Sequence, residues 1–143
     1  MQLKIGNRHQ TNFQMLALKK IHHIAIICSD YERSKKFYTE VLRFEIKAEY
    51  YRPERQSYKL DLSLNGIYTL ELFSFPSPPP RVSRPEACGL RHLAFEVYDL
   101  EAALHYLHQH AVNSEPIRTD EYTQKKFTFF FDPDGLPLEL YET

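Results

Sequence analysis

The chain has 143 residues, of which 43% are hydrophobic and 26% are charged, and its formal net charge is −1. This length fits one compact domain with its own core. The balanced charge argues against nucleic acid as a partner, because phosphate backbones are bound by an excess of basic side chains. Apolar runs are short and only two cysteines occur, so we expect a cytoplasmic protein with reduced thiols and no membrane contact.

The first half of the chain predicts the order βαβββ. Residues 1–18 are mostly polar, and we expect an N-terminal extension there, before a single domain over residues 19–143. The β-branched run 21–28 predicts a strand, and Asp30 then offers an N-cap to a helix. Three strands should follow, the last two joined by a tight turn at Asn65-Gly66, over residues 44–51, 58–64 and 67–75. The first module therefore covers residues 19–75.

The second half repeats this order after a proline-rich linker at residues 76–89, which can continue neither a helix nor a sheet. In the second module, residues 90–143, we expect a strand at 90–97 and a helix at 100–110. Three strands follow, at residues 114–118, 126–131 and 136–141. The repeat predicts an α+β fold in which paired βαβββ modules form a cupped, mostly antiparallel sheet of eight strands with helices outside.

Each module pairs a histidine at the start of its first strand with a glutamate in its last strand. Glu71 follows His23 by 48 positions, and Glu139 follows His92 by 47. Alternation along the strands places these four side chains on the inner face, opposite the leucines that face the helices. The same alternation directs His22 towards the helices.

An inward glutamate is costly to bury unpaired, so two of them at matched positions of a repeat favour a metal site. An ion pair with Arg91 or a nearby lysine is the alternative explanation. Two imidazoles and two carboxylates suit a divalent nickel, cobalt, zinc, manganese or iron ion. Such an ion could bind two neighbouring oxygens of a substrate, polarise a carbonyl and stabilise an enediolate. Glu139 is the expected base for the proton beside that carbonyl, and Glu71 is the alternate. Three basic side chains could bind an anionic substrate tail at the rim, although such residues are mostly solvated surface: Arg118, Lys125 and Lys126.

Several motifs together resemble the vicinal oxygen chelate superfamily, which includes glyoxalase I, bleomycin resistance proteins and extradiol dioxygenases. They are the aspartates seven positions after His23 and His92, the closing strands with a Glu-Leu pair, and the Asp-Pro-Asp-Gly turn at 132–135. Within the superfamily the chain looks most like small glyoxalase-family proteins of the YaeR type, for which ELFSFP, SRPEACGLRHLAF and FDPDGLPLELYE are typical segments. The resemblance covers residues 21–142. It implies a homodimer with a small-molecule substrate and a divalent metal held by His23, Glu71, His92 and Glu139.

The resemblance implies a metal-dependent lyase or isomerase of the glyoxalase type, which abstracts a proton beside a carbonyl or hydroxyl group. Bacterial glyoxalase I holds glutathione through an arginine and an asparagine, four positions after the first and second ligands. Ile27 and Phe75 stand there in this chain, so the usual glutathione-binding residues are missing. Two alternatives stay open: an Fe(II)-dependent dioxygenase, which ordinarily uses two histidines and one carboxylate, and a non-catalytic protein that binds a drug or metabolite. The ligands of one site could come from one chain or, as in parts of the superfamily, from two.

Overall fold

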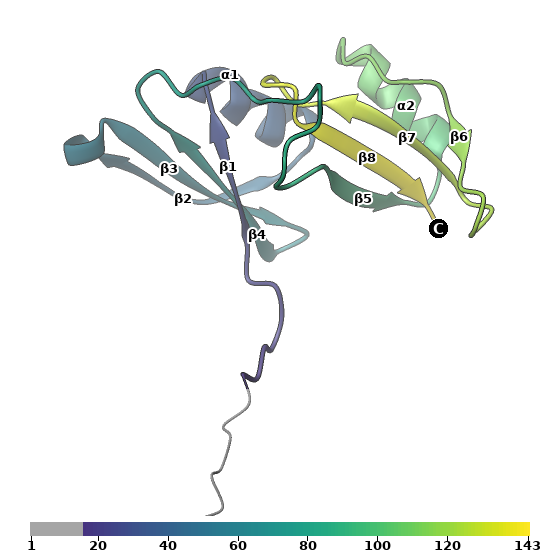
Figure 1. The fold of residues 1–143 in the computed structure, drawn as a ribbon, viewed down its shortest axis with the longest axis horizontal. Coiled ribbons are helices and arrows are strands. Elements are labelled where there is room, and N and C mark those ends of the chain that lie inside the picture. Colours follow the sequence, from purple (N-terminus) through teal and green to yellow (C-terminus); the bar gives the residue numbers. More distant parts are fainter. Residues whose placement is uncertain (1–15) are drawn as a thin grey trace, which may run out of the picture.

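Residues 16–143 form eight strands divided between two four-stranded sheets, one from each half of the chain (Figure 1). This computed structural model describes residues 16–143, so most of the expected N-terminal extension lies outside the described residues. The α+β fold of two βαβββ modules is confirmed, with the eight strands in two separate sheets and not in one continuous ladder. No helix within residues 16–143 is long and apolar enough to cross a membrane.

The first sheet has the order β1-β4-β3-β2, in which β1 and β4 run parallel and the other pairs are antiparallel. Its helix begins where the Asp30 side chain accepts a hydrogen bond from the Arg33 N–H, as the N-cap pattern predicts. The elements are β1 (Ile24–Cys28), α1 (Tyr31–Lys36), a π-helical turn (Phe37–Val41), β2 (Glu45–Arg52), a 3-10 turn (Pro53–Arg55), β3 (Ser57–Leu64) and β4 (Ile67–Ser74).

The second sheet repeats this topology in the order β5-β8-β7-β6, with β5 and β8 parallel. Its elements are β5 (Leu93–Val97), α2 (Leu100–Gln109), β6 (Arg118–Thr119), β7 (Lys126–Phe131) and β8 (Pro137–Glu142). The strand expected over 114–118 is reduced to an isolated bridge between Ser114 and Phe130 and to the short β6. Pro116 explains the gap, because it has no N–H to donate to a neighbouring strand.

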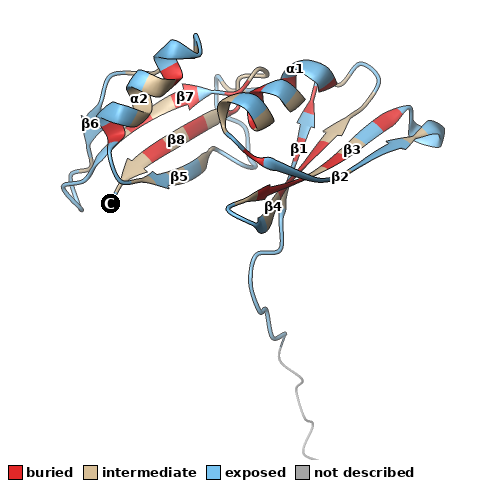
Figure 2. Ribbon diagram, turned by 180° about the vertical axis from the view of Figure 1, so that it is seen from behind, coloured by how far each residue is buried: buried red, intermediate tan, exposed pale blue. Residues whose placement is uncertain are grey.

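Side chains near the Asp-Pro-Asp-Gly turn join the two modules. The Tyr38 hydroxyl donates to Asp132 Oδ2 over 3.0 Å, and the Ser29 N–H donates to Asp134 Oδ2 over 2.9 Å. Burial raises the pKa of the Asp132 carboxyl, although the hydrogen bonds it accepts oppose this shift. Buried residues are concentrated in the central strands of each sheet and along the helices, whereas β2 is largely exposed (Figure 2). The packed core thus holds β1 and β4, and likewise β5 and β8, as rigid supports for the candidate residues.

Candidate metal centre

In the first module, His23 and Glu71 form a close pair. His23 directly precedes β1, and Glu71 lies opposite Ala25 in the parallel pairing of β1 with β4. The distance from His23 Nε2 to Glu71 Oε2 is 3.5 Å. The Glu71 side chain is only 10% exposed, whereas that of His23 is 35% exposed. The carboxylate is therefore inward, as strand alternation predicts, and the imidazole covers it from the open side.

Polar neighbours hold Glu71 in its ionised form. Lys59 Nζ lies 2.8 Å from Glu71 Oε1, and the Tyr68 hydroxyl donates to the same oxygen. Lys59 also pairs with Asp61, which faces Glu71 across β3 and β4. Burial works to raise the pKa of Glu71, but the hydrogen bonds from Lys59 and Tyr68 outweigh it and keep that pKa below its usual value. The alternative of an ion pair with a nearby lysine therefore holds for Glu71 in the isolated chain.

In the second module, His92 and Glu139 repeat the pair in matching register. His92 directly precedes β5, and Glu139 lies opposite Ala94 in the parallel pairing of β5 with β8. His92 Nε2 and Glu139 Oε2 are 3.0 Å apart, and the two side chains are 30% and 13% exposed. His92 Nδ1 is buried and has no hydrogen-bond partner among the described residues.

The surroundings of the two glutamates differ. The residue opposite Glu139 on β7 is Phe129, whose ring meets the His92 ring edge to face at a centroid distance of 5.2 Å. Phe129 thus takes the place that Asp61 has in the first module, and no lysine pairs with Glu139 among residues 16–143. Arg91, the other candidate partner, pairs with Glu86 instead. One carboxylate therefore lies in a charged network and the other beside an aromatic ring.

The spacing within each pair fits two ligands of one metal ion. Metal bonds to imidazole nitrogen and carboxylate oxygen of about 2.0–2.2 Å put two ligand atoms at right angles roughly 3 Å apart. The measured nitrogen–oxygen distances of 3.5 and 3.0 Å are close to that separation. Nitrogen and oxygen donors of this kind suit divalent first-row metals. Each module thus offers half of the expected ligand set.

The four residues form two pairs and not one group within a single chain. Across residues 16–143, no cluster of three or more His, Cys, Asp or Glu side chains is arranged to hold a metal ion. The first pair belongs to the sheet of β1 and β4 and the second to the sheet of β5 and β8, which lie side by side in Figure 1. A complete set of four ligands therefore requires a second copy of the chain or a closing motion of the two sheets.

Sequence reasoning named a nearby lysine as an alternative partner without identifying Lys59, missed Tyr68 and Asp61, and misplaced His22. The Nδ1 atoms of His22 and His23 are 2.7 Å apart, and both rings lie against Tyr68, so His22 does not face the helices. Both histidines precede β1, where strand alternation no longer applies. Lys59 and Asp61 were detectable only as two of the polar positions that alternate with leucines in β3.

A family profile described as the Glyoxalase/Bleomycin resistance protein/Dioxygenase superfamily matches residues 20–140, which include all four candidate ligands. The chain belongs to this superfamily. It is 66% identical over 127 residues to the uncharacterized protein YwkD of Bacillus subtilis (strain 168), covering 89% of this chain and 99% of YwkD. It is 64% identical over 128 residues to the uncharacterized protein YaeR of Escherichia coli (strain K12), covering 90% and 99%. The crystal structure of a glyoxalase family protein from Enterococcus faecalis superposes with a TM-score of 0.82 at 52% identity, covering 87% of this chain and 98% of that one.

More distant matches show what this superfamily's fold can support. A 2-epi-5-epi-valiolone epimerase from Actinomyces sp is 29% identical, over 84% of this chain and 77% of that protein. A mutant of the fosfomycin resistance protein FosX from Listeria monocytogenes shares the fold, with a TM-score of 0.69 at 16% identity, over 89% of this chain and 94% of that one. That FosX structure contains manganese(II) and a dihydroxypropylphosphonic acid.

Proposed function

We propose that the protein is a metal-dependent lyase or isomerase of the glyoxalase type, which removes a proton beside a carbonyl or hydroxyl group of a small substrate. The observation that supports this most is the repeated pair of imidazole and carboxylate, in matching register and with nitrogen–oxygen distances of 3.5 and 3.0 Å. The likeness to an epimerase and to a manganese-containing FosX adds support. Ile27 and Phe75 replace the usual glutathione-binding residues, which supports a substrate other than a glutathione adduct.

We assign the metal to His23, Glu71, His92 and Glu139, and proton transfer to Glu139. A bound divalent cation would supply Lewis-acid activation of the substrate's oxygen. Glu71 is the less suitable base, because Lys59 and Tyr68 already occupy one of its oxygens. Glu139 has only His92 as its ion-pair partner among the described residues, and it lies opposite Phe129 with its side chain 13% exposed. Glu139 is therefore the better placed of the two carboxylates to act as the base.

We also propose that the working unit is a homodimer in the cytoplasm. Within one chain the candidate ligands form two separate pairs, so a first module meeting a partner's second module would complete the set. Both cysteines are free, Cys28 buried and Cys88 exposed, as expected for a reducing compartment.

Elemental analysis and metal titration of the purified protein test the metal centre. The wild type is compared with His92→Gln and with His105→Gln, a matched control on the exposed side of α2. We expect His92→Gln to weaken metal binding by about a hundredfold or more, since even outer partners of metal ligands contribute 10- to 100-fold. The control should bind metal as the wild type does. Equal affinity of all three proteins would refute the ligand assignment.

A substrate panel with the retained metal tests the reaction class. Hemithioacetals and 2-oxo acids should be converted without oxygen uptake. A protein that is purified without metal and binds its ligand in the presence of a chelator would instead be a non-catalytic binding protein.

One observation favours an Fe(II)-dependent dioxygenase as the second candidate. If Glu71 stays bound to Lys59 and Tyr68 and does not coordinate the metal, three metal ligands remain. They are His23, His92 and Glu139. Two histidines and one carboxylate with open positions are the usual iron site of such oxygenases. Oxygen uptake by the Fe(II)-loaded protein with a catechol would place this candidate first.

A further inference from the structure

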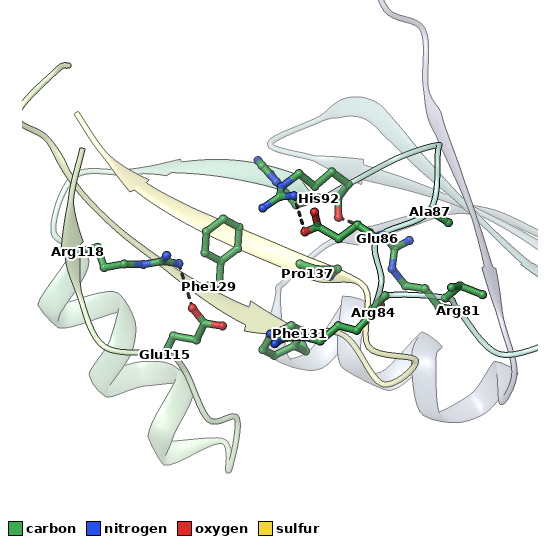
Figure 3. Close-up of a pocket in the computed structure, with 13 residues that line it drawn as sticks. Arg81, Arg84, Glu86, Ala87, His92, Glu115, Arg118, Phe129, Phe131 and Pro137 are labelled. Atoms are coloured by element: carbon green, nitrogen blue, oxygen red, sulfur yellow. Dashed lines mark hydrogen bonds and ion pairs between the residues drawn. The ribbon is translucent and has the colours of Figure 1, made fainter. Parts of the chain in front are cut away.

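A cavity of about 430 Å³ opens beside His92, on the second module (Figure 3). Its walls come from the linker before β5 and from the segment around β6, β7 and β8. The lining is rich in guanidinium groups, which outnumber the carboxylates by four to two: Arg81, Arg84, Arg91 and Arg118 against Glu86 and Glu115. A cavity of this size can enclose a small molecule, and its excess positive charge favours an anion.

Two of these arginines have no carboxylate partner in the described part of the chain. Arg91 pairs with Glu86, and Arg118 Nη2 lies 3.0 Å from Glu115 Oε2. Arg81 instead donates to the backbone carbonyl oxygens of Leu90 and Arg91, over 2.7 and 3.1 Å. Within residues 16–143, no carboxylate lies at ion-pair distance from Arg81 or Arg84.

The Arg118 guanidinium lies one aromatic ring away from the candidate metal centre. The Arg118 guanidinium carbon lies 5.2 Å from the centroid of the Phe129 ring and 5.0 Å from that of Phe127. Phe129 in turn meets the His92 ring edge to face at 5.2 Å. Figure 3 shows Arg118 beside Phe129 at one end of the cavity and Arg81 at the other. Stacking on aromatic faces leaves the planar edge of a guanidinium for hydrogen bonds, and an anion bound to Arg118 would share that edge with Glu115.

From these contacts we infer that the cavity binds an oxyanion group of the substrate, a carboxylate or a phosphoryl group, through Arg84 and Arg118. The reacting end of the same molecule then lies at His92, a placement that rests on the proposed function. Of the three basic residues singled out from the sequence, only Arg118 lines the cavity. Lys126 instead pairs with Glu101, and Lys125 is not among the residues that line the cavity. The substrate is therefore a small anionic carbonyl or hydroxyl compound.

Anion titrations of the metal-free protein, followed by amide chemical shifts, test the inference without any turnover. Methylphosphonate and acetate are used in separate arms. We expect saturable binding of at least one, weakened about tenfold or more by Arg84→Gln and by Arg118→Gln, since a hydrogen bond to a charged group contributes about this much. Arg55→Gln removes the same charge from an exposed site outside the cavity and should change nothing. The tighter anion indicates whether the substrate carries a phosphoryl or a carboxylate group.

Absence of saturable binding of both anions, or equal weakening by all three substitutions, would overturn the inference. Metal titration of the same variants separates this outcome from a failure of the metal centre. Arginine is no metal ligand, so Arg84→Gln and Arg118→Gln should bind metal as the wild type does. A protein that binds the anions but no metal would keep the oxyanion site and lose the proposed function.

Discussion

Two inactive variants should recover activity when mixed, if each metal centre joins the first module of one chain to the second module of its partner. His23→Gln breaks the first pair and His92→Gln breaks the second. In either homodimer, both metal centres then lack one imidazole. In a mixed dimer, one centre carries both substitutions and the other carries neither.

The expected recovery follows from this geometry. Random exchange between equal amounts of the two chains makes about half of the dimers mixed, so about a quarter of all metal centres are intact. A centre formed within one chain would not recover, because every chain keeps its own lesion. A centre formed by the same module of both chains would not recover either. In a mixed dimer, each such centre contains one substituted residue.

The assay is metal retained per chain after a chelator wash, together with turnover, on chains mixed under conditions that exchange subunits. Native mass spectrometry counts the mixed dimers. His92→Gln mixed with Glu139→Gln is the matched control for turnover, since both substitutions lie in the second module and every centre lacks either a ligand or the proposed base. Full formation of mixed dimers without recovery, or recovery in the control as well, would refute the arrangement.

Four other substitutions probe the site and the fold. Glu139→Gln should keep much of the metal affinity, because an amide oxygen can still coordinate, but abolish turnover; unchanged kcat would rule out Glu139 as the base. Lys59→Met should strengthen metal binding measured by calorimetry, because it removes an ammonium group 2.8 Å from Glu71 Oε1, and weaker binding would contradict this. Hydrogen bonds from Lys35 and Tyr31 lower the pKa of the largely solvated Glu49 below its ordinary 4.5. Glu49→Gln should therefore reduce the free energy of unfolding by no more than about 1 kcal/mol at pH 7. In denaturant melts this difference should be present above the ordinary pKa and fade as the pH falls through the lowered one; a difference that persists at low pH would exclude the ionic cause. Leu138→Ala, at a fully buried position of β8, should cost about 2–5 kcal/mol in the same melts, whereas the control Leu18→Ala, at a position 84% exposed, should cost almost nothing.

The order of elements and the inward glutamates could be predicted from the sequence, because the two modules repeat the same apolar alternation. The leucines on either side of each glutamate are buried, as expected for the strand face that packs against the helices. They are Leu70, Leu72, Leu138 and Leu140. Those two features depend only on local periodicity. The pairing of β1 with β4, which places the start of β1 and hence His23 beside Glu71, is parallel and was not predicted.

A β-bulge explains why the partners of Glu71 could not be predicted. A regular hairpin from Asn65-Gly66 would place Leu60 opposite Glu71. The observed pairing shifts between Leu62 and Ser63, where β4 has one extra residue, so Asp61 faces Glu71 instead. The same extra residue brings Tyr68, three positions before Glu71, onto the face of that carboxylate, where alternation alone excludes it.

How the two pairs of histidine and glutamate combine into one metal centre could not be predicted from the sequence, for a different reason. Strand alternation assigns a side chain to a face of its own sheet, but it contains no information on how two sheets are placed. The residues between β4 and β5 form neither helix nor strand, and the contacts between the modules are made by side chains such as Tyr38 and Asp132. Whether one chain or two complete the metal centre therefore depends on tertiary packing that periodicity does not encode.

The two modules share a frame but differ at the strand that faces each glutamate, and this difference explains a division of roles. In the first module, Lys59 and Asp61 on β3 surround Glu71 with charge, which favours a permanently ionised ligand. In the second, Phe129 on β7 both faces Glu139 and supports the Arg118 guanidinium. A single aromatic residue thus lies between the proposed base and the proposed oxyanion site. On these proposals, the second module binds and deprotonates the substrate, and the first supplies the charge that holds the metal.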